Sequence, residues 1–482
     1  MPPLTRNTGG ARRWSLCSAN KSVPQTCDWR GVAIDEPLFE THMHTLESIV
    51  ANRFVECADR NPKADPDGEQ SAATMFLIPY PATDVIVKFL PDAKALAAAD
   101  ASALQVDRDL QRHHEAVKAY VSRSPAWRRC SGCDHVLVVS RSSADYPQRC
   151  PWGCGDIDEG VYMLPKPARE PRAYGFRLDD PFWQNATILT QEQIPPSHAA
   201  LPNVFPVARP TSMHPRTSSE LLAWQRKMAA SRRDHFMTLA ATAKNHRSHL
   251  IHACASDNST RCNFVDCKVK GACGSRMLYR IYARSTYCLM PHGDTPSRRA
   301  IFDALVCGCI PIVYHRYSFH WPWHVPDRAA AAILVPSPTT LFGVNLAKRS
   351  FDRATHAIGS LFDAFAGALG VAGGFGHAGE ARSRQGGPLH GASRADVASA
   401  NQTLQNAYAR TLEVVLRRSA AQVEAQRRHI IWRLLPNVCY HYGDLDAADA
   451  VTVAMRQIRV RIDAAKRSTR GSRSGFGQVG RA

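Results

Sequence analysis

Two adjacent arginines, Arg298 and Arg299, follow a polar loop at residues 291–297 that contains a glycine. Arginine forms charge-assisted hydrogen bonds with phosphate oxygens, and a glycine-containing loop that leads into a helix N-terminus favours an anionic ligand. Asp303 comes four residues after Arg299, so both side chains lie near one face of the expected helix. Its carboxylate is suited to ribose hydroxyls. These residue types in this order predict a site for a nucleotide-sugar diphosphate.

Three residues of the loop are further candidates for the same site. Gly293 has no side chain, so the backbone can approach a phosphate closely there. Asp294 serves either as a ligand or as a turn or N-cap residue. Ser297 is the last residue of the loop and completes the donor-binding candidates around the two arginines.

The elements that hold this loop are predicted to be two strands and a helix. Residues 287–290 and 310–314 are short apolar runs, as in buried parallel strands, and an apolar helix between them ends at Gly308. Ligands of open parallel sheets bind beyond the carboxyl ends of the strands, which is where this loop begins. Strand and helix patterns also alternate in the preceding half of the chain, and the whole predicts an α/β protein.

Residues 287–312 resemble the exostosin-type glycosyltransferases (glycosyltransferase family 47), whose pattern is roughly F-C-L-x-P-x-G-D-x-x-x-R-R-x-x-F-D-x-x-x-x-G-C-I-P-V. The double arginine and residues 321–326, which contain Trp321, Trp323 and His324, are most similar to the plant xyloglucan galactosyltransferase subgroup. The resemblance covers roughly residues 38–462. The competing interpretation is an unrelated α/β crossover with two solvated arginines, which would not require the whole motif.

The resemblance implies a GT-B fold, in which two Rossmann-like domains face each other across the active site. It also implies an inverting transfer from a UDP-sugar, UDP-galactose or a related one, to a cell-wall or matrix glycan or a glycoprotein. We expect no cofactor and no divalent metal, because such enzymes typically need none and no D-x-D motif follows a predicted strand. The resemblance further implies residence in the Golgi with a type II anchor. This chain shows no apolar run of about 20 residues that could be that anchor.

The remaining site residues are less certain in their roles. Asp134 and His135 match the family's D-H before a strand and are the candidates for the catalytic base. Lys244 stands where the subgroup has an arginine, and it would contact the donor without the bidentate fork of arginine. His324, with the neighbouring tryptophans, contacts either the donor or the acceptor, or else fills a domain interface.

Composition changes along the chain predict its organisation. The expected segments are an irregular N-terminus (1–37), an acceptor-side Rossmann-like domain (38–230), a nucleotide-sugar-binding domain (231–365), a disordered Gly/Ala-rich insertion (366–400), C-terminal helices that complete the fold (401–462) and a disordered basic tail (463–482).

Cysteine content and charge leave other functions open. Cys130, Cys133, Cys150 and Cys154 have a spacing close to a zinc ribbon, but disulfides in an oxidising lumen are the favoured interpretation. A zinc-ribbon protein with the formal net charge of +18 would bind nucleic acid, although the motif at residues 287–312 has no place there, and we expect no nucleic-acid partner. A third interpretation is a degenerate family member that acts as a partner subunit of a transferase complex.

Overall fold

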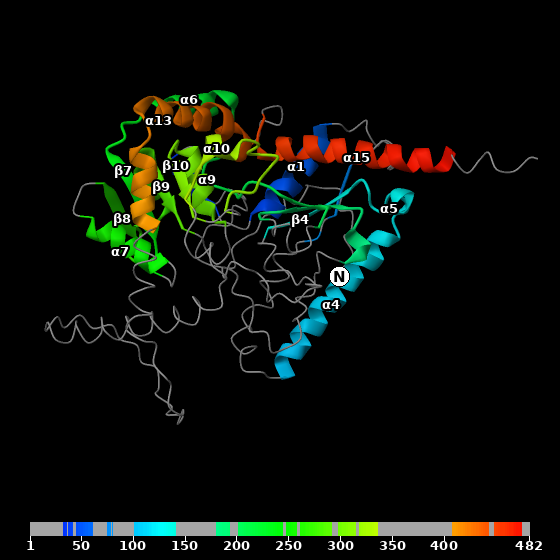
Figure 1. The fold of residues 1–482 in the computed structure, drawn as a ribbon. Coiled ribbons are helices and arrows are strands. Elements are labelled where there is room, and N and C mark those ends of the chain that lie inside the picture. Colours follow the sequence, from blue (N-terminus) through cyan, green and yellow to red (C-terminus); the bar gives the residue numbers. More distant parts are fainter. Residues whose placement is uncertain are drawn as a thin grey trace, which may run out of the picture.

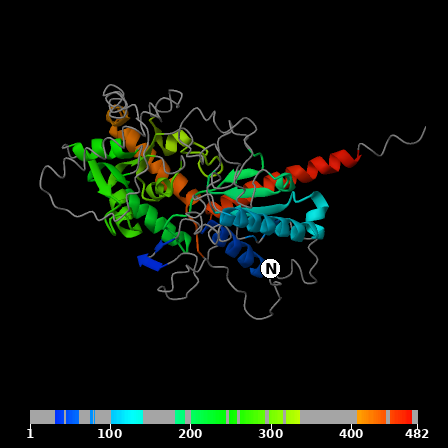
Figure 2. The same ribbon diagram turned by 90° about the horizontal axis from the view of Figure 1, so that it is seen from below.

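The computed structural model describes most of the residues between 32 and 474 and leaves gaps between them. The described ranges are 32–35, 37–41, 45–60, 75–78, 80, 101–140, 180–192, 201–243, 247–257, 261–291, 297–314, 318–335, 407–442 and 448–474. Within them the protein is α/β, with two parallel sheets that lie side by side (Figures 1 and 2). Two parallel sheets in two halves of the chain are the arrangement expected of the GT-B fold.

The N-terminal sheet has four parallel strands in the order in which they follow along the chain. They are β3 (Phe76–Leu77), β4 (His135–Val139), β5 (Thr187–Thr190) and β6 (Val204–Pro206). Every residue of β4 is buried. A strand whose side chains are buried on both faces of the sheet needs helices that cover both of these faces.

Two helices provide this cover, and the alternation of side chains along β4 divides its residues between them. Val136 and Val138 belong to a core cluster with residues of α1 (Leu46–Arg60), whereas Leu137 and Val139 belong to another with residues of α4 (Ala101–Ser122). The sheet therefore lies between α1 and α4. The short helices α5 (Pro125–Cys130) and η4 (Pro181–Trp183) precede β4 and β5.

The C-terminal sheet has five parallel strands in the order β11-β10-β9-β7-β8. They are β7 (His235–Ala241), β8 (Cys262–Asp266), β9 (Ser285–Met290), β10 (Ile310–Val313) and β11 (Ile333–Leu334). The chain adds β8 on one side of β7 and β9 on the other. The strand order therefore reverses between β7 and β9, which is the point where sheets of this kind bind ligands.

The helices of this half pack around the five strands. They are α6 (Ser218–Ala230), α7 (Ser248–Ser256), α8 (Ser275–Ala283), α9 (Arg299–Val306) and α10 (Arg328–Ala331), followed by α13 (Ala420–His429), the π-helix η8 (Ile430–Leu434) and α14 (Leu435–Val438). Residues 407–416 are also helical. The sheet of the N-terminal half ends at Pro206 and that of the C-terminal half begins at His235, on either side of residue 230.

The last helix, α15 (Ala450–Ser474), returns to the N-terminal half and runs along it (Figure 1). Arg461 donates to the carbonyl oxygen of Pro202, and Lys466 Nζ lies 3.9 Å from the carboxylate of Asp134. Residues 463–474, expected to be part of a disordered tail, are helical and continue α15, with alanine, lysine and arginine as the residues that favour a helix. Residues 475–482 lie outside the described part.

The N-terminal end also differs from expectation. Residues 32–35, which we expected to be irregular, form β1 (Val32–Asp35) in an antiparallel pair with β2 (Leu38–Glu40). The amide of Phe39 donates to the carbonyl oxygen of Ser212, so the pair is attached to the chain between β6 and α6. The insertion at 366–400 lies outside the described residues.

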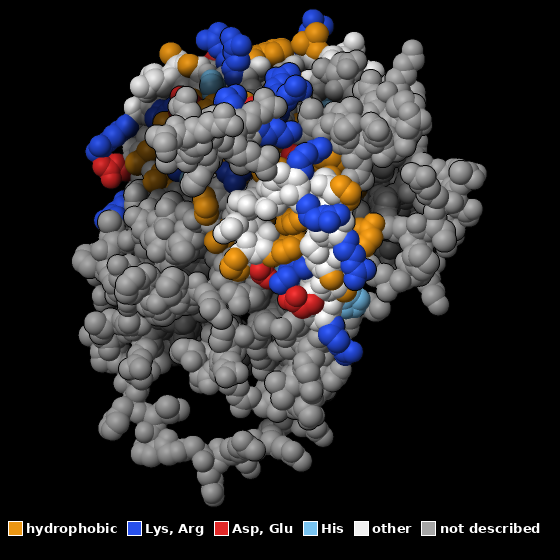
Figure 3. All heavy atoms as spheres, turned by 90° about the vertical axis from the view of Figure 1, so that its right-hand side faces the viewer, with side chains coloured by type: hydrophobic (Ala, Val, Ile, Leu, Met, Phe, Trp, Pro, Cys, Tyr) orange, Lys and Arg blue, Asp and Glu red, His pale blue; other side chains and the backbone are white. Residues whose placement is uncertain are grey.

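Lysine and arginine side chains gather on the face formed by α4, α5 and α15 (Figure 3). The exposed ones include Arg112, Arg123, Arg128, Arg129, Arg456, Arg459 and Arg467. None of the helices described in the structure combines the length and the apolar character needed to cross a bilayer.

Among the described residues, four disulfides join cysteines that are close in sequence, three of them in the C-terminal half. They are Cys130–Cys133, Cys254–Cys262, Cys267–Cys273 and Cys288–Cys309. The last one ties β9 to the residue that precedes β10, and both of its cysteines are fully buried. The strand that leads to the predicted donor loop is therefore covalently joined to its neighbour.

Removing the Cys288–Cys309 disulfide is expected to lower the free energy of unfolding by about 3 kcal/mol, since it closes a loop of 21 residues. The measurement is denaturant unfolding of the Cys288→Ala/Cys309→Ala double variant. A Cys267→Ala/Cys273→Ala variant is the control, and it should lose less because its loop spans 6 residues. Equal losses in both variants would contradict the expectation.

Candidate functional site

Arg298 spans the point where the strand order of the five-stranded sheet reverses. Its guanidinium donates to the carbonyl oxygen of Ala240 in β7 (3.3 Å) and to that of Pro291, the residue after β9 (3.4 Å). These two carbonyls lie at the carboxyl ends of neighbouring parallel strands. Arg298 is also the N-cap residue of α9, so its charge stands at a helix N-terminus, where anions bind favourably.

Arg298 is half-buried. Burial lowers the pKa of Arg298, and the electrostatic influence of Tyr282 and Asp303 opposes this effect without cancelling it. Among the described residues, no carboxylate lies within 4.0 Å of its guanidinium. A desolvated cation with two long hydrogen bonds to carbonyls favours an anionic ligand such as a diphosphate.

Arg299 points to the other half of the molecule instead. Its guanidinium donates to the carbonyl oxygen of Thr41 and to Ser212 Oγ, and its Nε lies 3.4 Å from the carboxylate of Asp303. The two arginines that the sequence treats alike thus have different surroundings. Arg299 joins α9 to the segments that follow β2 and β6.

Asp303 takes part in the same internal network. It is 5% exposed, and it accepts a hydrogen bond from the hydroxyl of Tyr279 (2.9 Å) in addition to its contact with Arg299. Burial raises the pKa of Asp303, and the charge of Arg299 opposes this. The Tyr279 hydroxyl in turn accepts from the amide of Ser212. With both carboxylate oxygens engaged by protein groups, this geometry favours a structural role over the expected ribose contact.

Ser297 meets a polar cluster from the N-terminal half that the sequence did not suggest. Its amide donates to Glu192 (2.9 Å), and its hydroxyl accepts from Arg209 (2.9 Å). Arg209 also forms an ion pair with Glu192 (3.2 Å) and donates to the side chain of Gln191 (3.2 Å). Glu192 follows β5 and Arg209 follows β6, so the carboxyl edge of the first sheet meets Ser297 of the second half. A single glutamate and a single arginine gave no signal beyond their places after two strands.

The tryptophans near residue 321 pack between the two halves. Trp321 donates from its indole N–H to the carbonyl oxygen of Gln191 (3.2 Å), and Trp323 stacks on Phe205 with ring centroids 4.4 Å apart. This is the interface arrangement that the sequence left open. His324 is fully buried with Nε2 3.0 Å from the carbonyl oxygen of Ala450, and burial lowers its pKa to about 4. His324 is therefore a neutral side chain that holds the start of α15.

Asp134 and His135 lie at the amino end of β4, at the opposite edge of the sheet from Glu192 and Arg209. Asp134 is fully buried, with Arg129 and His135 within 2.9 Å of its oxygens. Burial alone would raise the pKa of Asp134, but the hydrogen bonds from His135 and Arg129 outweigh it and lower the pKa. This position and these partners favour a structural ion pair and give no support to a catalytic base there.

We expect Asp134→Asn to lower the free energy of unfolding by about 3 kcal/mol at neutral pH, because it leaves buried donors without their charge partner. The pKa of Asp134 is depressed below 3.8 in the folded state, so the difference from wild type should persist above about pH 4 and disappear as the pH falls further. The measurements are urea unfolding at several pH values and turnover per folded molecule. A fall in turnover of 100-fold or more would restore the catalytic-base prediction.

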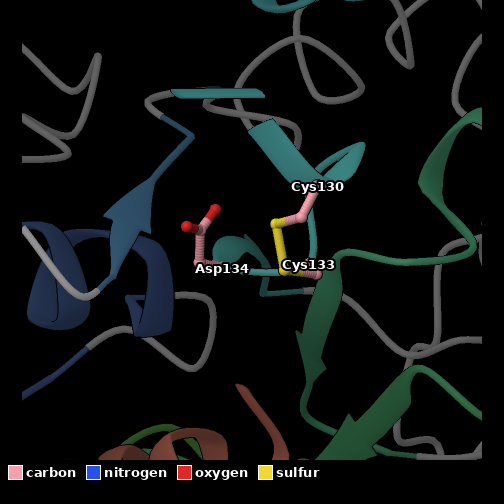
Figure 4. Close-up of side chains that lie close together, drawn as sticks. All are labelled: Cys130, Cys133 and Asp134. Carbon is pink, nitrogen blue, oxygen red and sulfur yellow. A yellow bond between two sulfur atoms is a disulfide. The ribbon is translucent and has the colours of Figure 1, made fainter. Parts of the chain in front are cut away.

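The candidate metal sites in the described part are occupied by other bonds. Cys130 and Cys133 form a disulfide beside Asp134, so these two cysteines offer no thiolates to a zinc ion (Figure 4). The second group is His114, Glu115 and Asp180, and Lys118 Nζ lies 2.9 Å from each of the two carboxylates. Its ammonium group already supplies the positive charge there.

Several predicted residues fall outside the described ranges. They are Gly293, Asp294, Lys244, Cys150 and Cys154.

A comparison with protein-family models decides the family. The model of the exostosin GT47 domain matches residues 16–349, which is more than half of the chain. The chain belongs to the exostosin GT47 family. The match includes all five strands of the C-terminal sheet, Arg298 and the Glu192–Arg209 cluster.

The curated relatives of this exostosin-family protein are plant proteins from Arabidopsis thaliana. A probable xyloglucan galactosyltransferase (GT20) is 26% identical over 60% of this chain and 45% of its own length. A xyloglucan-specific galacturonosyltransferase is 26% identical over 60% of this chain and 38% of its own. The xyloglucan galactosyltransferase XLT2 is 29% identical over 60% and 50%. The expected likeness to the xyloglucan galactosyltransferase subgroup is thus confirmed, and the chain spans half or less of the length of these three relatives.

A crystal structure of the GtfA/B complex matches 72% of this chain and 60% of its own, at 8% identity and a TM-score of 0.27. That score is too low to support any statement about this protein.

Proposed function

We propose that this exostosin-family protein is an inverting glycosyltransferase. It moves a sugar, with galactose as the first choice, from a UDP-sugar to a hydroxyl of a cell-wall or matrix glycan or of a glycoprotein. The observation that carries the proposal is the position of Arg298 across the carboxyl ends of β7 and β9, at the N-terminus of α9. The names of the relatives, galactosyl- and galacturonosyltransferases, support a hexose or a hexuronate.

In the proposed reaction the acceptor hydroxyl attacks the anomeric carbon as it gives up its proton to a general base. The bond between that carbon and the diphosphate oxygen breaks, and UDP leaves with an additional negative charge. Arg298 and the N-terminus of α9 stabilise this charge, which is larger in the transition state than in the bound donor. The positive charge that a divalent metal supplies in other transferases is provided here by a side chain, and the proposal therefore includes no metal and no cofactor.

The proposal also includes residence in the Golgi, where glycans are extended. The four disulfides support an oxidising compartment, since cytosolic thiols are kept reduced. The acceptor side of the site would be formed by the N-terminal half, whose strand ends at Glu192 and Arg209 face the donor-side loop.

The test is calorimetric titration of the protein with UDP in the presence of a chelator, followed by a turnover screen of UDP-sugars on xyloglucan fragments. Micromolar binding without metal and transfer from one UDP-sugar are the expected results. Binding without transfer from any sugar would favour a partner subunit of a transferase complex. No binding by the folded protein would rule out the proposed function.

A further inference from the structure

Two charged residues of the N-terminal half, Glu192 and Arg209, contact Ser297. Glu192 and Arg209 are each 5% exposed, and Ser297 is 2% exposed. The Glu192 carboxylate accepts the Ser297 amide at one oxygen and Arg209 at the other. Arg209 places both its Nε and its second terminal nitrogen on Ser297 Oγ, at 3.2 and 2.9 Å.

Such a pair is costly to bury unless its hydrogen bonds are nearly all made. Here they are made across the boundary between the two halves, between residues whose numbers differ by 105. Gln191 adds its side-chain oxygen to Arg209 and its carbonyl oxygen to Trp321. Gln191 and Glu192, the two residues that follow β5, therefore contact two different segments of the C-terminal half.

Ser297 immediately precedes Arg298, so whatever fixes Ser297 also fixes the start of α9. Among the described residues, the contacts that hold the Arg298 guanidinium are two long hydrogen bonds, of 3.3 and 3.4 Å. Those contacts alone leave its direction poorly determined. The short contacts one residue earlier are the stronger restraint on where the Arg298 backbone lies.

We propose that Glu192 and Arg209 are positioning residues for the donor site. They hold Ser297 so that Arg298 stays across the strand reversal, and they couple the position of the acceptor-side half to donor binding. The inference rests on the proposed function, because its effect is read through UDP and the sugar donor. Neither residue needs to touch the donor for this role.

The test uses Arg209→Met, Ser297→Ala, both together, and Arg209→Lys. Arg209→Met and Ser297→Ala are each expected to weaken UDP binding and lower kcat/KM by at least tenfold. The double variant should be no worse than Arg209→Met within about twofold, because both changes remove the same contact. Arg209→Lys should recover part of the loss, since it keeps the charge beside Glu192 but not the fork.

Arg129→Met is the matched control, because Arg129 also pairs with a buried acid of the same half but at the opposite edge of the sheet. It should lower stability without changing UDP affinity. UDP affinity and kcat/KM within twofold of wild type in folded Arg209→Met would overturn the proposal, as would an equal effect of Arg129→Met.

Hydrogen exchange separates this inference from the proposed function. Amides at the start of α9 should exchange at least tenfold faster in Arg209→Met and in Ser297→Ala than in wild type, with or without UDP. If wild type fails to bind UDP, the proposed function fails, and faster exchange alone would then support only the restraint on α9. Unchanged exchange at these amides overturns the positioning role whatever UDP does.

Discussion

Replacing Arg298 with alanine is expected to weaken UDP binding about 100-fold while the protein stays folded. The variant removes the cation at the strand reversal and its charge-assisted hydrogen bonds, and a loss of this size corresponds to about 2.7 kcal/mol. Within the described part of the chain the variant loses two long hydrogen bonds to backbone carbonyls, so we expect a change of about 1 kcal/mol or less in stability. Calorimetric titration and urea unfolding measure the two quantities.

Arg299→Ala should behave in the opposite way. It removes the contacts with Thr41, Ser212 and Asp303 and leaves a buried carboxylate without its cation, at a cost of about 3 kcal/mol of stability. The UDP affinity of the folded protein should fall by less than about tenfold. Arg232→Ala is the control, because this arginine precedes β7, at the amino end of the strands of the same sheet, and its side chain is 91% exposed. Equal losses of affinity in Arg298→Ala and Arg299→Ala would contradict the division of roles.

Arg53→Met is expected to lower the free energy of unfolding by about 4 kcal/mol, the largest effect on stability that we predict. Arg53 of α1 donates to Asp449 (2.8 Å) and to the carbonyl oxygen of His441 (3.1 Å), and the Asp449 side chain is completely buried. Asp449 also caps α15, because its carboxylate accepts hydrogen bonds from the amide and the hydroxyl of Thr452. The variant leaves that carboxylate buried without a cation.

Urea unfolding measures this loss of stability, and a second substitution tests its cause. Asp449→Asn in the Arg53→Met background should recover part of the stability, because asparagine leaves no charge unpaired. Arg417→Met is the control, since Arg417 is 77% exposed and its pair with Glu413 should contribute under 1 kcal/mol. A loss below about 1.5 kcal/mol for Arg53→Met would mean that water reaches the Arg53–Asp449 pair.

Many strands and helices of the C-terminal half could be predicted, because the sequence patterns that indicate them are local. The apolar runs at 287–290 and 310–314 coincide with β9 and β10, and the arginines begin α9. The helix was expected to end at Gly308, and this residue has a φ of +63°. The sequence could not show that a Cβ there would lie 2.8 Å from Ile431, because that contact joins segments more than a hundred residues apart.

The roles of individual polar residues could not be predicted, because they depend on which half of the molecule each side chain faces. Arg298 and Arg299 are neighbours on one helix, yet one meets the strand ends and the other meets Thr41 and Ser212. Asp134 was chosen from its motif alone, and only the strand direction shows that it lies at the edge away from the donor loop. The sequence assigned no role to Glu192 or Arg209. Their contacts with Ser297 can be recognised only once the two sheets are placed edge to edge.

The return of α15 to the N-terminal half has a consequence for synthesis on the ribosome. The strands of that half are complete by residue 206, yet Asp449 and Lys466, the partners of Arg53 and Asp134, are synthesised only after the whole C-terminal sheet. Until then Arg53 lacks its carboxylate, and the surface that α15 covers is open. The N-terminal half therefore cannot reach its final packing before α15 has been synthesised. Its nascent form is expected to depend on chaperones until the last helix docks.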